Sequence, residues 1–196
     1  MERLAVRLQE LMESPSLESL AVDLEIAGFH LTGSIDGIRT DQLLRYRCAK
    51  IKPKDRLGIW LDHLILNLAA RVGDPGTSIL LGPDGRWTYP PVAQSGSILA
   101  QLLAVYWQGL SEPLPFFPGS AYAYAKSLYR GKPPVKALEE ANKQWEKSEF
   151  STAPAEEEDL YFQLGFGKIY PLDDRFKSLA VEIFEPLLVH QQEDKS

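Results

Sequence analysis

The amino-acid sequence predicts a mixed α/β fold, of the α+β kind, with its strands in the first half of the chain and its helices in the second. Residues 20–36 alternate between apolar and polar side chains with a period of two, as a half-buried strand does. Residues 43–51 form a further strand-like run, and apolar residues recur at helical spacing through most of 95–185. A chain of 196 residues, 44% of them hydrophobic, is long enough to bury a core, so we expect a single domain over residues 1–196.

The chain opens with a predicted amphipathic helix. Three leucines share one stripe of residues 1–13, and a Ser-Pro-Ser sequence then stops the helix. Because its outer face is charged, we interpret residues 1–16 as a possible docking helix. The alternating run of residues 20–36 turns at Ala27-Gly28, which predicts a β-hairpin.

A strand–helix–hairpin arrangement follows. Residues 43–51 predict a strand that ends before Pro53, because proline cannot continue a hydrogen-bonded ladder. Residues 55–71 carry a wide apolar stripe and predict a helix buried on more than one side. A second hairpin is expected over residues 79–89, with its turn at Gly82–Gly85.

The second half of the chain predicts helices. Their ranges are 95–109, 121–130, 135–147 and 173–185, and Pro186 ends or kinks the last of them. Residues 148–158 predict a loop, residues 160–166 form a short apolar segment, and residues 191–196 predict a disordered tail.

Composition limits the classes of function. The net charge of −6 does not attract nucleic acid as a whole, so charge must be considered locally. The single cysteine, Cys48, excludes a disulfide framework and is expected to pack on the apolar face of its strand. No apolar run approaches the length of a membrane span, and residues 1–15 do not resemble a signal peptide. We therefore predict a cytoplasmic protein without a membrane partner.

Residues 29–54 have the arrangement of a nuclease active site but not its residue types. Metal-dependent nucleases of the PD-(D/E)xK type place an Asp at the end of one strand and an acid-x-Lys pair on the next, so that carboxylates hold Mg²⁺. Here Asp36 ends the first strand, but Arg45 and Arg47 stand at the paired positions. Guanidinium groups repel a divalent cation and cannot ligate it. We predict no catalytic residue, no metal and no other cofactor, with Asp36 as a vestigial active-site position.

The same stretch is locally basic. Residues 39–56 carry a net charge of +5, which leaves −11 for the rest of the chain. Arginine and lysine side chains contact phosphates and position nucleic acid without reading its sequence. The predicted DNA-binding residues are Arg39, Arg45, Arg47, Lys50, Lys52 and Lys54. A protected strand edge, or an ion pair between Arg45 and Asp36, would explain the same charges without DNA.

Three segments resemble the gamma subunit of exodeoxyribonuclease V, the RecC-like family: LLRYRCAKIKPKDRLGIWLDHLIL, GLSEPLPFFPGSAYAYA and LDDRFKSLAVEIFEPLL. The resemblance implies a degenerate PD-(D/E)xK restriction-endonuclease-like core with added C-terminal helices, inactive as an enzyme by itself. It places Asp36 at the first acid of the related nucleases, and Arg45 and Arg47 at the acid and the lysine.

The resemblance also implies a function and partners. The domain would help to split duplex DNA and hand over its strands during DNA repair and recombination, in a helicase–nuclease complex. Its partners would be the beta (RecB-like) subunit, the alpha (RecD-like) subunit and DNA. The turn at Gly82–Gly85 and the turn at Ala27-Gly28 are both candidates for a strand-separating projection.

Two other functions stay open from the sequence. An active Mg²⁺-dependent nuclease would need a relocated acid, such as Asp41 or Asp62, to join Asp36. A purely structural subunit adaptor would never touch DNA, and Arg45 would be locked onto Asp36.

Overall fold

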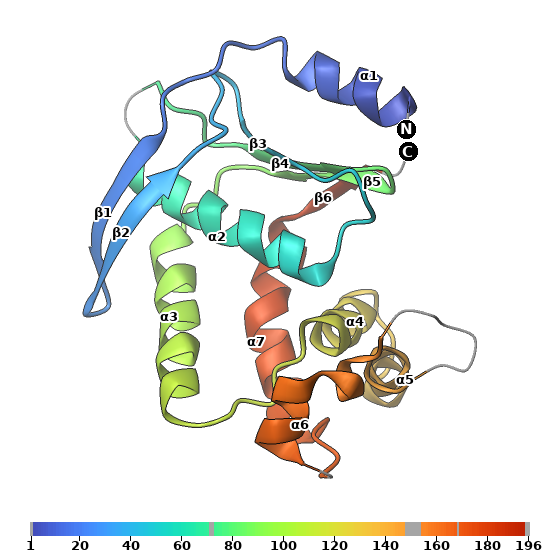
Figure 1. Ribbon diagram of the computed structural model, residues 1–196. Helices are drawn as coiled ribbons and strands as arrows, with labels where there is room; N and C mark the ends of the chain where they lie inside the picture. Colours follow the sequence, from blue (N-terminus) through green and yellow to red (C-terminus); the bar gives the residue numbers. More distant parts are fainter. Residues whose placement is uncertain (1, 71–72, 148–153, 168, 195–196) are drawn as a thin grey trace. The chain divides into compact units, whose positions relative to one another are not determined.

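The computed structural model describes residues 2–70, 73–147, 154–167 and 169–194 (Figure 1). The chain divides into two compact units. Residues 1–104 and 190–196 make up the sheet unit, and residues 105–189 make up the helical unit. That the whole chain is one domain stays a prediction.

A four-stranded sheet with the order β3-β4-β5-β6 forms the centre of the sheet unit. The strands are β3 (Leu43–Tyr46), β4 (Ser78–Gly82), β5 (Gly85–Tyr89) and β6 (Gln192–Asp194). β3 and β4 are parallel and are joined by α2 (Pro53–Ala69), which lies along one face of the sheet in Figure 1. The other pairings are antiparallel. The predicted mixed α/β class is confirmed.

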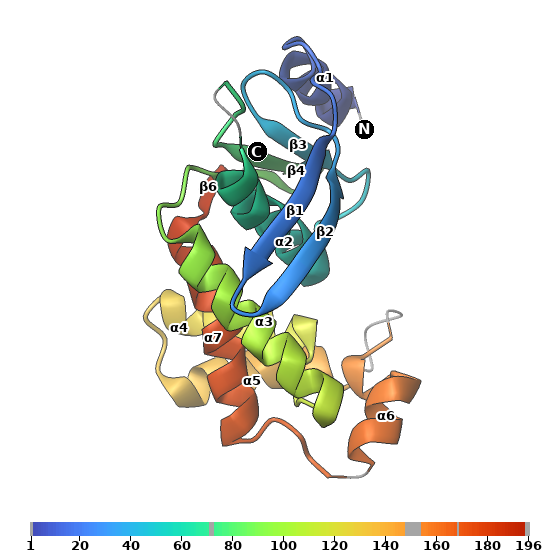
Figure 2. The same cartoon turned by 90° about the vertical axis from the view of Figure 1, so that its left-hand side faces the viewer.

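The predicted first hairpin forms a separate two-stranded sheet. β1 (Leu20–Ile26) and β2 (Phe29–Ile35) pair antiparallel and lie beside α2 in Figure 2. Their two turn residues, Ala27 and Gly28, have φ values of 49° and 82°, which suit the twist of a tight hairpin. The hairpin buries part of its apolar face in a core cluster with Leu66 of α2.

The strand that precedes Asp36 therefore does not belong to the sheet that contains Arg45 and Arg47. β2 and β3 do not pair with each other; the segment after β2 meets β3 through a bridge between Ile38 and Leu43 and through the Leu44 amide, which donates to the Gly37 carbonyl at 3.0 Å. In the nuclease arrangement the acid and its paired residues converge on one sheet. The degenerate PD-(D/E)xK core accordingly remains a proposal.

The N-terminal helix α1 (Glu2–Leu11) is tied to the sheet unit by its last turn. The Gln42 side-chain amide donates to the Leu11 carbonyl at 3.0 Å, and Arg39 Nε donates to the Ser14 carbonyl at 2.9 Å. Leu4 is buried. These contacts orient the helix within its own unit, and docking of residues 1–16 onto another body stays a prediction.

The helical unit is built around an aromatic cluster. Its elements are the second half of α3 (Ser95–Ser111), then α4 (Pro118–Tyr129), α5 (Pro134–Trp145), the 3-10 turn η1 (Glu156–Glu158), α6 (Leu160–Phe166) and most of α7 (Asp174–His190). The Phe117 ring is fully buried and lies 4.5–6.1 Å from the ring centroids of Trp145, Phe162, Phe166 and Phe176. No described helix is long and apolar enough to span a membrane.

Three details differ from the sequence expectation. Cys48 is exposed, because β3 ends at Tyr46 and the alternation of faces stops there. Of the two predicted effects of Pro186, an end of the helix is wrong, because Pro186 lies inside α7 and buried Ile183, Leu187 and Leu188 hold the flanking turns against the core; a kink stays a prediction. In the predicted disordered tail, residues 192–194 form β6; residues 195–196, and 148–153 of the predicted loop, lie outside the described residues.

Candidate functional site

Asp36, the predicted vestigial active-site position, stands directly before a glycine turn. Asp36 follows β2, and Gly37 has a φ of 69°, a conformation that side chains other than glycine rarely adopt. A Cβ atom on Gly37 would lie 2.7 Å from Arg45 Nη1 and 3.0 Å from the Leu44 carbonyl oxygen. The absent side chain lets Arg45 of β3 reach back to Asp36.

Arg45 joins three elements through its guanidinium. Nη1 lies 2.8 Å from Asp36 Oδ1 and donates to the Asp36 carbonyl at 2.7 Å. On its other side, Nη2 and Nε donate to Asp62 Oδ2 of α2 at 2.8 and 3.1 Å. The Asp36 side chain is 80% exposed, whereas those of Arg45 and Asp62 are 29% and 31% exposed. The pair with Asp62 is therefore better shielded from water than the pair with Asp36.

This geometry places an organic cation between two carboxylates. A guanidinium supplies donors only, so it can neutralise the carboxylates but cannot ligate a metal or accept a proton. Asp41, a candidate relocated ligand, instead accepts a hydrogen bond from Ser14 Oγ at 2.6 Å. In the described part of the chain no three His, Cys, Asp or Glu side chains are grouped to hold a metal ion.

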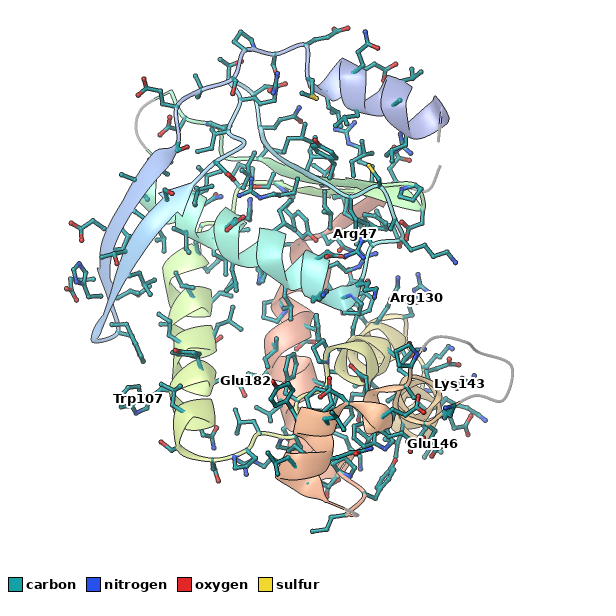
Figure 3. The ribbon with its side chains drawn as sticks, in the orientation of Figure 1. Arg47, Trp107, Arg130, Lys143, Glu146 and Glu182 are labelled. Atoms are coloured by element: carbon teal, nitrogen blue, oxygen red, sulfur yellow. The ribbon has the colours of Figure 1, made fainter. Side chains whose placement is uncertain are left out.

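Arg47, just after β3, also pairs with a carboxylate of α2, in the first turn of that helix. Its Nη1 donates to Asp55 Oδ1 and Oδ2 at 3.0 and 3.1 Å, and Asp55 Oδ2 also accepts from the Lys52 amide at 2.7 Å. Asp84 Oδ1, in the β4–β5 turn, accepts from the Ile51 amide at 3.1 Å. Figure 3 shows Arg47 beside the first turn of α2. Hydrogen bonds therefore hold the connection from β3 to α2 in place at both of its ends.

The six predicted DNA-binding residues fall into two groups. Arg39, Arg45 and Arg47 are hydrogen-bonded within the sheet unit. Lys50, Lys52 and Lys54 are exposed on the connection to α2 and its first turn, and none has an ion pair among the described residues. The structure brings five of the six to β3 and the segment after it, and separates Arg39, which binds the end of α1. Contact of any of them with DNA stays a prediction.

Sequence reasoning named Asp36 as a possible partner of Arg45 but missed Asp62 as its second partner and Asp55 as the partner of Arg47. Asp62 was considered only as a relocated metal ligand. A signal was available in the spacing. Arg45 and Arg47 are two apart on a strand and share a face, whereas Asp55 and Asp62 are seven apart and share a face of a helix.

The two candidate strand-separating turns differ in their surroundings. Ala27 and Gly28 are exposed at the tip of the β1–β2 hairpin, and a Cβ on Gly28 would meet no atom within 4 Å. The β4–β5 turn is held against the β3–α2 connection, because Asp84 binds the Ile51 amide and buried Gly82 faces the Ile51 side chain. A role of either turn in strand separation stays a prediction.

Comparison with known proteins identifies the family. Residues 1–129 match the model of the RecC C-terminal domain. The chain is 32% identical to the RecBCD enzyme subunit RecC of Escherichia coli K12 over 57% of this chain and 10% of that protein. It is 24% identical to the subunit of the same name from Buchnera aphidicola subsp. Schizaphis graminum, over 92% of this chain and 17% of that protein.

A third relative is the RecBCD enzyme subunit RecC of Mycolicibacterium smegmatis, at 31% identity over 58% of this chain and 11% of that protein. The chain thus spans between a tenth and about a sixth of the length of these curated relatives. The family match covers the hairpin, the β3–α2 site and the beginning of the helical unit. The resemblance noted in the sequence is confirmed: the chain belongs to the RecC C-terminal domain family.

Proposed function

We propose that this domain is a non-catalytic DNA-binding and scaffolding part of an exodeoxyribonuclease V gamma subunit. It would assist duplex splitting and strand handover in double-strand-break repair and recombination. Its partners would be the beta (RecB-like) and alpha (RecD-like) subunits together with DNA. Family membership supports this proposal, since the curated relatives are named as subunits of the RecBCD enzyme.

The observation that carries the non-catalytic part is the position of Arg45 between Asp36 and Asp62. A metal-dependent nuclease would direct these carboxylates at Mg²⁺ and a scissile phosphate. Here they are neutralised by a side chain that also ties β3 to α2 and to the end of β2. In this proposal the carboxylates that would hold a metal are instead occupied by Arg45.

The DNA-binding part is supported by three exposed lysines. Lys50, Lys52 and Lys54 lie on a connection whose backbone is fixed by Asp55 and Asp84. A fixed backbone lowers the conformational entropy that binding must remove, and ammonium groups without an ion pair to any described residue are available for phosphates. In this proposal the lysines contact DNA directly, and Arg45 and Arg47 hold the surface that presents them.

A structural adaptor without DNA contact is the second candidate. Its specific support is that all three predicted arginines donate hydrogen bonds to groups within the sheet unit, although the buried Nε of Arg47 has no partner among the described residues. An adaptor needs the same rigid connection but does not need the lysines. The two candidates therefore make opposite predictions for lysine substitutions.

Binding of the full chain to forked DNA, alone and with the beta subunit, separates the candidates. We expect the triple change Lys50→Ala, Lys52→Ala and Lys54→Ala to weaken fork binding in a fluorescence anisotropy titration. The matched control is the triple change Lys132→Ala, Lys136→Ala and Lys143→Ala, which removes the same charge from the helical unit. Equal effects of the two triples, with binding to the beta subunit intact, would favour the adaptor.

The same samples test the catalytic alternative. Degradation of the fork that requires Mg²⁺ and disappears in Asp36→Asn would establish a nuclease and overturn the non-catalytic proposal. We expect intact DNA in every lane, because Asp36 and Asp62 are both engaged by Arg45.

A further inference from the structure

Helix α6 carries apolar side chains on its inward and its outward face, with Gln163 between them. Leu160, Tyr161 and Leu164 face outward and are 76%, 83% and 85% exposed. Phe162 and Phe166 of the same helix face inward and contact the Phe117 ring. Large exposed apolar patches mark sites of interaction.

A pocket of about 610 Å³ opens beside this helix, within the helical unit. Its apolar lining is aromatic for the most part and comes from the end of α5, from α6 and from the segment before α7: Trp145, Phe162, Phe166, Ile169 and Tyr170. Gln163 also lines the pocket and lies on α6 between the inward and the outward face. The pocket and the outward face of α6 therefore adjoin one another.

The polar part of the pocket is acidic. Glu146 and Glu157 line it, and Lys147, the described cation next to Glu146 in the sequence, is paired with Glu158 at 2.5 Å. Glu157 accepts a hydrogen bond from the Lys147 backbone amide at 2.7 Å, and, after Glu158, its carboxylate also contributes to raising the pKa of the Lys147 ammonium. Glu146 is exposed and has no ion pair among the described residues; Figure 3 shows it at the end of α5.

The other acids nearby have tasks within the fold. Glu156 accepts the amides of Gly119 and Ser120 at 2.7 and 2.8 Å and so caps α4, while Asp159 caps α6. Two carboxylates, Glu146 and Glu157, are thus left facing an aromatic-lined pocket. A cation above aromatic rings, with carboxylates within reach, is the ligand that best matches this lining.

We propose that this pocket receives an arginine or lysine side chain from a segment of a partner protein, whose apolar neighbours cover the outward face of α6. Nucleic acid is disfavoured by the acidic rim, and a wholly apolar ligand would bury the carboxylates without a partner. The pocket lies outside residues 1–129, the range that matches the family model. This inference does not depend on DNA binding by the sheet unit.

The probe is an acetylated and amidated pentapeptide of alternating leucine and arginine, titrated into the full chain by calorimetry. A second peptide carries citrulline, the neutral isostere, in place of arginine. We expect the arginine peptide to bind more tightly. The double change Glu146→Gln with Glu157→Gln should weaken binding of the arginine peptide about fivefold, since exposed charge pairs each contribute modestly, and should remove the preference over citrulline.

Matched controls separate the pocket from general effects. Glu182→Gln removes an exposed acid from α7, and Val135→Ser removes an apolar side chain that is 71% exposed on α5. Neither should change peptide binding, whereas Leu164→Ser should weaken both peptides. Equal binding of the arginine and citrulline peptides, or no binding, would overturn the proposal. So would self-association of the chain that Leu164→Ser abolishes, because a second copy would then be the occupant.

Fork binding by the same variants keeps the two proposals apart. The pocket double variant should bind forked DNA as the unmodified chain does, because its changes lie outside the sheet unit. Loss of peptide binding with normal fork binding therefore concerns the pocket alone.

Discussion

Arg45 lies between two carboxylates and connects three parts of the sheet unit. Its guanidinium makes hydrogen bonds to both sides, and the planar fork of donors reaches Asp36 and Asp62 at once. Lysine would supply one point charge and could not join β2, β3 and α2 in the same way. The residue type matters here through its geometry as much as its charge.

The two carboxylates around Arg45 should differ in their contribution to stability. We expect Asp62→Asn to lower the free energy of unfolding by about 1–2 kcal/mol, because it weakens two shielded, charge-assisted hydrogen bonds. Asp36→Asn should cost less than about 1 kcal/mol, because that side chain is 80% exposed. Urea denaturation measures both, and a larger loss for Asp36→Asn would contradict the ranking.

Gly37 should be intolerant of a side chain. Gly37→Ala is expected to cost about 1–3 kcal/mol of stability, from its positive φ together with the close approach of Arg45 Nη1 and the Leu44 carbonyl. Gly28→Ala is the matched control, since Gly28 has a φ of 82° but no atom within 4 Å of the added carbon. Denaturation curves should show Gly37→Ala as the more harmful change; equal costs would mean that packing at Gly37 is irrelevant.

His63 gives the sheet unit a dependence on pH. Burial lowers the pKa of the His63 imidazole to about 4, although its hydrogen bond to the Pro90 carbonyl opposes the shift. Because that carbonyl can only accept, Nε2 donates to it and Nδ1 accepts from Ser78 Oγ at 2.8 Å. The folded chain therefore holds a neutral ring where the unfolded chain would bind a proton.

As pH falls from about 6.5 to about 4, protonation favours the unfolded chain, so stability should fall. The slope due to His63 should approach about 1.4 kcal/mol per pH unit. His63→Gln removes this titration and should have a flatter profile over the same range, measured by urea denaturation at several pH values. Parallel profiles would show that His63 is not the source.

At the scale of elements, β6 connects the end of the chain to the sheet. Gln191 Oε1, just before this strand, accepts from Arg56 Nη1 at 2.9 Å and from Tyr89 Oη at 3.2 Å. Arg56 is itself buried and lies 3.9 Å from the centre of the Trp87 ring. Residues that the sequence assigned to a tail thus satisfy groups inside the sheet unit.

Gln191→Ala should therefore destabilise the chain by about 1–3 kcal/mol, because it removes the acceptor that two largely buried donors share. Gln192→Ala, at an exposed neighbouring position, is the control and should be nearly neutral. Thermal and urea denaturation report both variants. If Gln191→Ala left the stability unchanged, the C-terminal segment would not contribute to stability through this residue.

At the scale of the whole molecule, charge is distributed unevenly. The net charge is −6, but residues 39–56 carry +5, so attraction to DNA depends on a local surface. The Lys50, Lys52 and Lys54 triple variant and its control from the helical unit have the same net charge. A difference between them therefore reports where the charge lies.

The salt dependence of fork binding should follow this local charge. If the three lysines contact phosphates, their removal should flatten the plot of log affinity against log salt by up to about 0.9 per lost contact. The control triple should leave the slope unchanged. Anisotropy titrations between low and physiological salt measure both slopes, and identical slopes for the two triples would remove the lysines from the interface.

Elements formed by residues close together in the sequence were predicted better than those that depend on residues far apart. The β1–β2 hairpin was predicted from an alternating run and a Gly-containing turn, and the helix after β3 from its apolar stripe; both are confirmed. Cys48 was placed wrongly, because strand length depends on where pairing with β4 stops. The strand at residues 192–194 had no sequence signal, because its polar residues pair only with β5.

The sequence by itself determined that Arg45 and Arg47 cannot ligate a metal ion, because a guanidinium has no lone pair for a metal wherever it lies. It also determined the local elements and, through them, the mixed class of the fold. Only the tertiary structure decided which acids accept hydrogen bonds from these arginines, that β2 and β3 lie in different sheets, and that Gln191 accepts a hydrogen bond from Arg56. Such pairings join residues far apart in the chain, up to 135 positions for Arg56 and Gln191, and depend on packing rather than on local propensity.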